Sequence, residues 1–567
     1  MRCAALLALV FFAPFLTTGG PATARAALDP GVETRLRNTA PGETLTVLVE
    51  LKSQADLDSI RGEKEVRQRE VVERLEAKAD AAQEPLLARL ARDKATGKVK
   101  KVVALWISNS VAVTATPGEI EALAARPEVA AITPNETIPE PVMPTATTAT
   151  TPEANLDVIG APALWDLGIT GSGVVVASMD TGVDAGHPDL STRWRGGTNS
   201  WFDPSGEHPS VPTDRSGHGT WTMGVMVGGS AGGTAIGVAP DARWISAKIF
   251  NDRGYATTVG IHQSFQWLLD PDGDPTTPDA PDVVNASWSM ADPGCYLEFQ
   301  PDLQALLAAN ILPVFAAGNY GPNASTSVSP ANYPEALAVG AATNSDAIYQ
   351  YSSRGPSGCG EDPNTFPEVV APGVGIRSTD LLGTYATATG TSMSAPHAAG
   401  TLALLLSTAP DLTTAEQREA LTGSAVDLGP AGPDNDYGHG RIDALAAYEA
   451  LKSTSSVDSL ITGKRKHARF IPKTRFKAGK QVVIRAHVVD GEGQNLGDAA
   501  VELTVRGPDG DGVAELSAST GADGMADFVY GTDRESPGGR YTVEVTTVNK
   551  TGYEYSPGTV STSFALR

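Results

Sequence analysis

Residues 174–182 read Val-Val-Val-Ala-Ser-Met-Asp-Thr-Gly, an apolar run that ends abruptly in an aspartate and a glycine. Apolar runs without alternating polar residues are typical of strands that are buried on both faces of a parallel sheet. Helical segments separate this run from four later ones of the same character, at 283–287, 311–317, 336–341 and 368–371. The pattern predicts an α/β domain with a parallel sheet over residues 154–450.

The segments on either side of this domain have different patterns. Residues 27–138 combine a strand-like run at 45–51 with a long charged helical stretch at 57–94, which predicts a small α+β unit. Residues 139–153 are rich in proline, threonine and alanine, so we expect a poorly ordered linker that contains a processing site. Residues 462–567 alternate apolar and polar positions, which predicts an all-β, immunoglobulin-like sandwich of about seven strands.

The charge and the first residues of the chain indicate an exported protein. The 567 residues carry a formal net charge of −23, which argues against nucleic acid and membranes as partners, and we expect a monomer. Residues 1–26 combine Arg2, an apolar stretch too short to span a bilayer, and a small-residue cleavage site. These features predict a signal peptide and a secreted, extracellular protein.

Removal of that signal peptide would leave two cysteines, Cys295 and Cys359. An even number of cysteines in an exported chain favours a disulfide, and two buried free thiols are the alternative. The sequence leaves both states open.

Asp180 directly follows the first apolar run, and catalytic groups of open α/β sheets gather at the carboxyl ends of the strands. A turn-capping aspartate is the alternative. The triplet Asp180-Thr181-Gly182 would also suit an aspartic protease, but that chemistry requires two carboxylates that share a proton. A second D-T-G or D-S-G is absent from the sequence, so we reject it.

Two histidines are candidates for accepting a proton. His218 lies between Gly217 and Gly219, which would leave its imidazole uncovered, and a small apolar run follows it. His397 comes five residues after Ser392 on a predicted helix, so the two side chains would point about 140° apart. We therefore predict that His218 serves Ser392 and that His397 is structural.

Ser392 and Asn319 provide the other groups that acyl transfer needs. Ser392 begins a small, apolar helix whose first N–H groups can hold an oxyanion, and an ordinary helix cap is the alternative. Asn319 follows the apolar run at 311–317, where its amide can donate to developing negative charge. With Asp180 and His218, the chain thus has an acid, a base, a nucleophile and an oxyanion donor.

Four segments resemble the subtilases, a family of serine endopeptidases, and occur in the family's order: residues 178–184, 217–220, 316–319 and 390–397. The resemblance implies a three-layer subtilisin-like fold, a catalytic triad of Asp180, His218 and Ser392, and Asn319 in the oxyanion hole. It also implies that residues 27–138 are an inhibitory propeptide. The partners would then be a protein or peptide substrate and the chain's own propeptide.

The resemblance further implies a set of substrate-binding residues. The strand that should pair with substrate reads Ser287-Trp288-Ser289-Met290, and many relatives have two glycines at its last two positions. Gly318 and Tyr320 complete the set, with Tyr320 at the rim of the pocket for the residue before the cleaved bond. A neutral tyrosine there argues against a strong demand for a basic side chain.

This chemistry needs no cofactor, and we assign no metal ligand. The stretch Asp270-Pro271-Asp272-Gly273-Asp274 has carboxylates at alternate positions, as calcium loops do, but it lacks the full EF-hand spacing. Subtilases often bind calcium, so a structural calcium ion and a plain acidic surface loop are both left open.

An inactive protease scaffold that binds partners through the C-terminal sandwich is the alternative function. The presence of every member of the triad argues against it.

Overall fold

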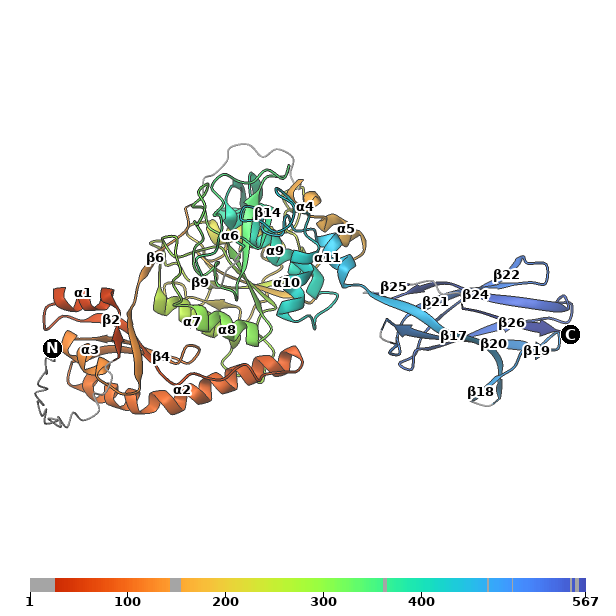
Figure 1. Ribbon diagram of the computed structural model, residues 1–567, viewed down its shortest axis with the longest axis horizontal. Helices are drawn as coiled ribbons and strands as arrows, with labels where there is room; N and C mark the ends of the chain where they lie inside the picture. Colours follow the sequence, from red (N-terminus) through yellow and green to blue (C-terminus); the bar gives the residue numbers. More distant parts are fainter. Residues whose placement is uncertain are drawn as a thin grey trace, which may run out of the picture.

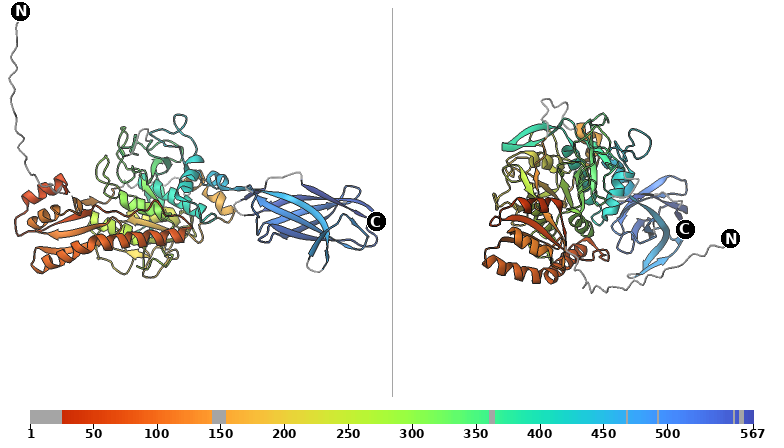
Figure 2. Two further views of the ribbon diagram at one scale, coloured as in Figure 1. Left: turned by 60° about the horizontal axis from the view of Figure 1, so that its bottom comes forward. Right: turned by 60° about the vertical axis from the view of Figure 1, so that its left-hand side comes forward.

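The computed structural model describes residues 26–142, 154–359, 365–466, 469–491, 493–550, 553–555 and 560–567. The chain forms an N-terminal, a central and a C-terminal part, which follow one another along the sequence (Figure 1, Figure 2). The first two parts pack against each other, whereas one long strand leads from the central part into the third. Most of the predicted signal peptide and residues 143–153 of the predicted linker lie outside the described residues.

The central part is built on a seven-stranded sheet in which every neighbouring pair of strands runs parallel. Every apolar run that predicted a buried strand lies in this sheet, which confirms the predicted α/β domain. The strand order is β14 (Val369–Pro372), β13 (Leu337–Ala342), β12 (Leu312–Ala316), β11 (Val283–Ala286), β7 (Val175–Asp180), β9 (Arg243–Lys248) and β8 (Trp201–Phe202).

Helices cover both faces of the sheet because successive strand residues point to opposite sides. Val176 belongs to a core cluster with α6 (His218–Val227) and α9 (Thr391–Leu406), whereas Ala177 belongs to a second cluster with α7 (Thr258–Leu269) and α8 (Gln300–Ala308). The central part therefore has three layers. Its other elements are α4 (Ala154–Val158), α5 (Ala161–Asp166), β10 (Tyr255–Thr257), β15 (Ile376–Asp380), β16 (Thr384–Ala388), α10 (Thr414–Gly423) and α11 (Ala444–Leu451).

The N-terminal part combines a five-stranded sheet with a long helix, α2 (Lys64–Ala95). This helix begins later than the predicted stretch at 57–94, because Gly62 has a φ of 118° and interrupts the helical conformation. Ile60, before the turn, packs into the cluster of α7 and α8. The other elements are β1 (Ala27–Leu28), α1 (Pro30–Asn38), β2 (Leu45–Leu51), β3 (Val99–Leu105), β4 (Ser110–Ala115), α3 (Pro117–Ala124), β5 (Val129–Pro134) and β6 (Thr137–Pro139).

The N-terminal part satisfies the ends of the two helices that it covers. The Arg67 guanidinium donates from Nε to the Ala308 carbonyl oxygen at 2.9 Å and so caps the C-terminal end of α8. The Asn135 side-chain oxygen accepts from the Val259 amide at 3.1 Å, in the first turn of α7. Just beyond Asn135, β6 pairs antiparallel with β10 of the central part.

The C-terminal part consists of two five-stranded sheets that share one core cluster. One contains β17 (Ser453–Lys466), β18 (Arg469–Pro472), β20 (Gln481–Asp490), β23 (Met525–Gly531) and β25 (Tyr553–Tyr555). The other contains β19 (Arg475–Phe476), β21 (Ala500–Arg506), β22 (Gly512–Ser519), β24 (Gly539–Asn549) and β26 (Ser561–Leu566). The strands outnumber the prediction and begin before residue 462, because several are short and the serine-rich start of β17 lacks apolar alternation.

Cys295 and Cys359 form a disulfide bond. Of the two states that the sequence leaves open, the structure therefore has the disulfide and not the free thiols. The two residues are 64 positions apart, and the bond ties the segment after β11 to the segment before β14. Within the described ranges, no helix combines the length and the apolar character needed to cross a membrane.

Candidate active site

Asp180 is the last residue of β7 and is fully buried, so its carboxylate depends on hydrogen bonds. Its Oδ1 accepts from the Thr181 amide and from Nδ1 of His218, both at 2.7 Å. Its Oδ2 accepts from the Thr222 hydroxyl at 3.3 Å. Three donors, two of them from α6, therefore hold the carboxylate at the carboxyl edge of the sheet.

His218 is the first residue of α6, and Asp214 fixes the start of that helix. Asp214 Oδ1 accepts from the Gly217 amide at 2.9 Å, and its Oδ2 accepts from the Thr220 amide at 3.0 Å. The helix approaches β7 so closely that a Cβ at Gly219 would collide with the Gly182 carbonyl oxygen. This close approach brings the imidazole of His218 against Asp180. Sequence reasoning missed Asp214, which lies four residues before His218 in an otherwise irregular stretch.

The electrostatic setting of His218 suits a base. Burial alone would lower its pKa, but the charge and hydrogen bond of Asp180 outweigh burial and raise the pKa above the usual 6.5. The carboxylates of Asp214 and Glu140 add to this rise. Because Nδ1 donates to Asp180, Nε2 is the acceptor of the neutral ring. Nε2 is buried and has no hydrogen-bond partner among the described residues.

Ser392 is the second residue of α9, which packs beside α6 in the same core cluster. Its hydroxyl donates to the Ser287 carbonyl oxygen at 3.3 Å rather than to Nε2 of His218. The structure thus forms the Asp180–His218 hydrogen bond of the predicted triad but not the His218–Ser392 one. In the absence of substrate, catalytic hydrogen bonds are often long or differently aligned.

Asn319 is held at the start of α9. Its side-chain oxygen accepts from the Thr391 amide at 3.0 Å and from the Thr391 hydroxyl at 3.2 Å. Because these donors require an oxygen at that position, the NH₂ group is the part of the side chain that is left to donate elsewhere. Thr391 is a further residue that sequence reasoning did not single out, although it directly precedes Ser392.

Ser392, Thr391 and Asn319 line a cleft with a volume of about 340 Å³. All five predicted substrate-binding residues line it too. The indole of Trp288, however, lies in the core against Phe299 and Phe315, with ring centroids 5.7 and 5.6 Å apart. Trp288 therefore contributes to the cleft without offering its ring to a ligand. The Tyr320 hydroxyl donates to the Ala291 carbonyl oxygen at 2.7 Å across the cleft.

Comparisons of the sequence with known proteins agree with this arrangement of residues. The subtilase family model matches residues 171–440. Bacillopeptidase F of Bacillus subtilis (strain 168) is 36% identical over 414 residues, which are 67% of this chain but 28% of that protein. Subtilisin E of the same organism is 36% identical over 291 residues, and subtilisin of Bacillus pumilus is 35% identical over 291 residues. These two matches cover 51% of this chain, and 69% and 96% of the relatives.

The chain belongs to the subtilase family. This confirms the resemblance seen in the four sequence segments and makes the chain, by family, a serine endopeptidase.

The end of the N-terminal part occupies the cleft of this subtilase. Residues 139–142 line the same cavity as Ser392 and Asn319, and the Glu140 amide donates to the Gly254 carbonyl oxygen at 2.9 Å. Burial raises the pKa of Glu140, whereas a hydrogen bond with Ser216 and the charge of His218 lower it. These four residues are the first of the predicted linker, so the linker begins inside the cleft.

His397 has the structural setting that was predicted for it. Its Nδ1 donates to the Met393 carbonyl oxygen at 2.7 Å, and Nε2 lies 2.9 Å from the Asn155 amide nitrogen. Complete burial lowers its pKa to about 4, so the ring stays neutral. Both nitrogens are occupied inside the core, which leaves none for Ser392.

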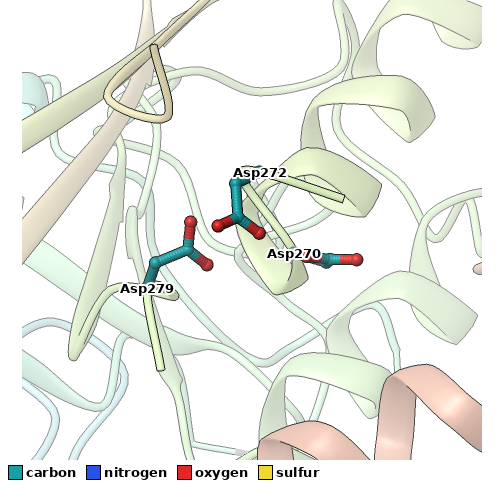
Figure 3. A group of neighbouring side chains, drawn as sticks. All are labelled: Asp270, Asp272 and Asp279. Carbon is teal, nitrogen blue, oxygen red and sulfur yellow. The ribbon is translucent and has the colours of Figure 1, made fainter. Parts of the chain in front are cut away.

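Asp270, Asp272 and Asp279 gather in the loop between α7 and β11 (Figure 3). One carboxylate oxygen of each lies within 4.8 Å of the others. Burial and the neighbouring carboxylates raise the pKa of both Asp270 and Asp279 to about 6. The sequence placed Asp274 in this group, but Asp274 binds Thr276 instead, and Asp279 takes its place.

We predict that the charge of Glu140 contributes to the raised pKa of His218. In full-length Ser392→Ala protein, Glu140→Gln should lower the His218 pKa, because it removes a negative charge that stabilises the imidazolium. The measurement is an NMR titration of the histidine ring carbons. The control is Glu136→Gln, which removes a carboxylate four residues before Glu140 that pairs with Arg35. This control should leave the His218 pKa unchanged. An unchanged or higher His218 pKa in Glu140→Gln would contradict the assignment.

Proposed function

We propose that this subtilase is a secreted serine endopeptidase that is made as a zymogen and hydrolyses proteins through an acyl-enzyme. The observation that carries the proposal is the 2.7 Å hydrogen bond between buried Asp180 and His218, beside the helix that begins with Thr391 and Ser392. Buried carboxylate–imidazole pairs next to a serine are suited to activating that serine as a nucleophile.

The proposed reaction begins when a substrate enters and the Ser392 hydroxyl leaves the Ser287 carbonyl for Nε2 of His218. The oxygen then attacks the scissile carbonyl carbon while Nε2 takes its proton. Asp180 stabilises the resulting imidazolium through Nδ1, and the imidazolium passes the proton to the leaving amine. Water, activated by the same imidazole, releases the acyl group from Ser392.

The oxyanion of each tetrahedral intermediate is proposed to bind two donors. One is the NH₂ group of Asn319, whose orientation Thr391 fixes through two hydrogen bonds. The other is the Ser392 N–H, in the first turn of α9, where backbone N–H groups lack a helical acceptor. Because both donors are positioned before the reaction, little reorganisation is needed when the charge develops.

The zymogen proposal rests on the contacts of the N-terminal part. Residues 27–138 would serve as the inhibitory propeptide, since they cap α7 and α8 and place residues 139–142 in the cleft. Cleavage in the linker up to residue 153 would free the cleft. We further propose that the segment at 1–26 directs secretion and that the enzyme is a monomer. Its substrates would be proteins, cleaved without a strong preference for a basic residue.

A structural calcium ion is proposed for the loop at 270–279. Calcium prefers carboxylate oxygens at 2.3–2.6 Å, and three such oxygens within 4.8 Å of one another could share one ion. Oδ1 of Asp270 is buried and has no hydrogen-bond donor in the described part of the chain, and a cation would satisfy it. Asp270, Asp272 and Asp279 would hold the ion, far from any step of the reaction.

We predict large losses of peptidase activity on removing the nucleophile or the oxyanion donor. Ser392→Ala should lower turnover by about 10⁶, the size found for the nucleophile of a subtilisin. Asn319→Ala should lower kcat by about 10²–10³, again on the scale of a subtilisin. Both are measured with a peptide substrate on protein whose propeptide has been removed. Ser394→Ala is the matched control, because Ser394 is buried on the same helix but has no catalytic role. Near wild-type turnover of Ser392→Ala would refute the mechanism.

We also predict that calcium stabilises the protein through the loop at 270–279. A calcium concentration of about a hundred times Kd would add about 2.7 kcal/mol to the free energy of unfolding. The Tm should therefore rise with calcium and fall with a chelator. Asp272→Asn should abolish this difference, whereas Asp274→Asn should preserve it. If the wild-type protein had the same Tm with calcium and with chelator, the proposal of a bound calcium ion would be wrong.

A further inference from the structure

One segment of the C-terminal part departs sharply from the charge of the rest of the chain. Residues 459–489 contain nine lysines and arginines and no aspartate or glutamate, in a protein of net charge −23. The overall charge, which argued against polyanions as partners, therefore hides a strongly basic segment. Solubility does not explain it, because the chain is already highly charged with the opposite sign.

The fold projects part of this segment away from the sandwich. β20 pairs with β17 only as far as Gly463, whereas β18 pairs with β17 from Gly463 to Lys466. The last residues of β17 and the whole of β18 therefore form a two-stranded ribbon that extends beyond the sheet. Figure 1 shows β18 standing out from the side of the C-terminal part, away from the central part.

The ribbon gathers cations on one of its faces. Lys464 lies opposite Ile471 and Lys466 lies opposite Arg469, and alternation along a strand puts these four side chains on the same side. On β17 this side is continuous with Leu460 and Thr462, which are buried in the sandwich. Lysines thus replace core residues at the point where the strand leaves the core.

These cations are exposed and lack counter-charges. Arg465, on the other face, shares Asp527 with Arg485, at 2.8 and 2.6 Å. Within the described ranges, by contrast, no ion pair within 4.0 Å involves the remaining exposed cations of the segment, which are Lys464, Lys466, Arg469, Lys473, Arg475, Lys477 and Lys480. Seven unpaired cations at one end of an acidic protein produce a localised positive field.

We propose that this surface, the basic ribbon of Lys464, Lys466, Arg469 and Lys473 with the cations that follow it, binds a linear polymer of repeating phosphate groups. Lysines predominate, and an ammonium group is a point charge without the fixed fork of arginine, which suits a row of phosphates rather than one shaped anion. Charges more than about 10 Å away are largely screened at 0.1 M salt, so a narrow polymer that contacts only the protruding ribbon would be repelled little by the acidic remainder of the protein. Binding would hold the peptidase at a polyphosphorylated material without involving its cleft.

Two other occupants fit the structure less well. A planar anionic membrane would face the acidic surface of the rest of the chain as well as the ribbon. Among its described residues, the ribbon face also has only one exposed apolar side chain that could enter the bilayer, Ile471, at 36% exposure. A second copy would offer acidic surface, but it would also bring a second ribbon of the same positive charge.

The test is binding of long-chain inorganic polyphosphate, which contains no peptide bond for the enzyme to cut. Fluorescence anisotropy of labelled polyphosphate is measured over a range of salt concentrations with the processed enzyme that retains the C-terminal part. We expect Lys464→Gln/Lys466→Gln/Arg469→Gln to weaken binding at least tenfold. The slope of log affinity against log salt should fall in magnitude by about 2, since each contacted phosphate of a single strand contributes roughly 0.7.

The matched control, Arg243→Gln/Arg506→Gln/Lys550→Gln, removes the same charge elsewhere and should bind polyphosphate nearly as the wild-type protein does. Unchanged peptidase activity and Tm establish that both variants fold. Equal affinity of the ribbon variant and the control would overturn the proposal. So would binding to anionic vesicles without binding to polyphosphate, or salt-sensitive self-association that the ribbon variant abolishes.

Discussion

The site depends on the hydrogen bond between Asp180 and His218, because both groups are buried and neither could remain there alone. The carboxylate stands at the end of a strand and the imidazole at the start of a helix, so the bond forms only if the two backbones come very close. A Cβ at Gly219 would prevent this approach by striking the Gly182 carbonyl oxygen. The close packing at Gly219 therefore allows the contact with Asp180 that raises the pKa of His218.

Two helix ends of the central part also explain how the N-terminal part can block the cleft. The ends of α7 and α8 need partners for their free backbone groups, and Asn135 and Arg67 supply them. After β6 has paired with β10, the next described residues line the cleft. Glu140 then lies beside His218, where its charge favours the protonated imidazole and so opposes the base form that catalysis requires.

Much of this arrangement could be predicted from the sequence, for physical reasons that also explain the misses. Strands buried on both faces, such as β7, are continuous apolar runs, and Asp180 stands out as the polar residue that ends one. Three features depend on how loops fold back, which no periodicity encodes: the role of Asp214, the hydrogen bonds of Thr391, and the presence of Asp279 rather than Asp274 in the carboxylate cluster. Gly62 shortens α2 through its backbone conformation, and the serine-rich start of β17 forms a strand only because its neighbours pair with it.

The catalytic assignment can be tested by mapping where a fluorophosphonate labels the processed enzyme, with digestion and mass spectrometry. We predict a single adduct on Ser392, formed more slowly as the pH falls and His218 becomes protonated. An active enzyme that carries the label on another residue, or whose Ser392 stays unlabelled, would contradict it.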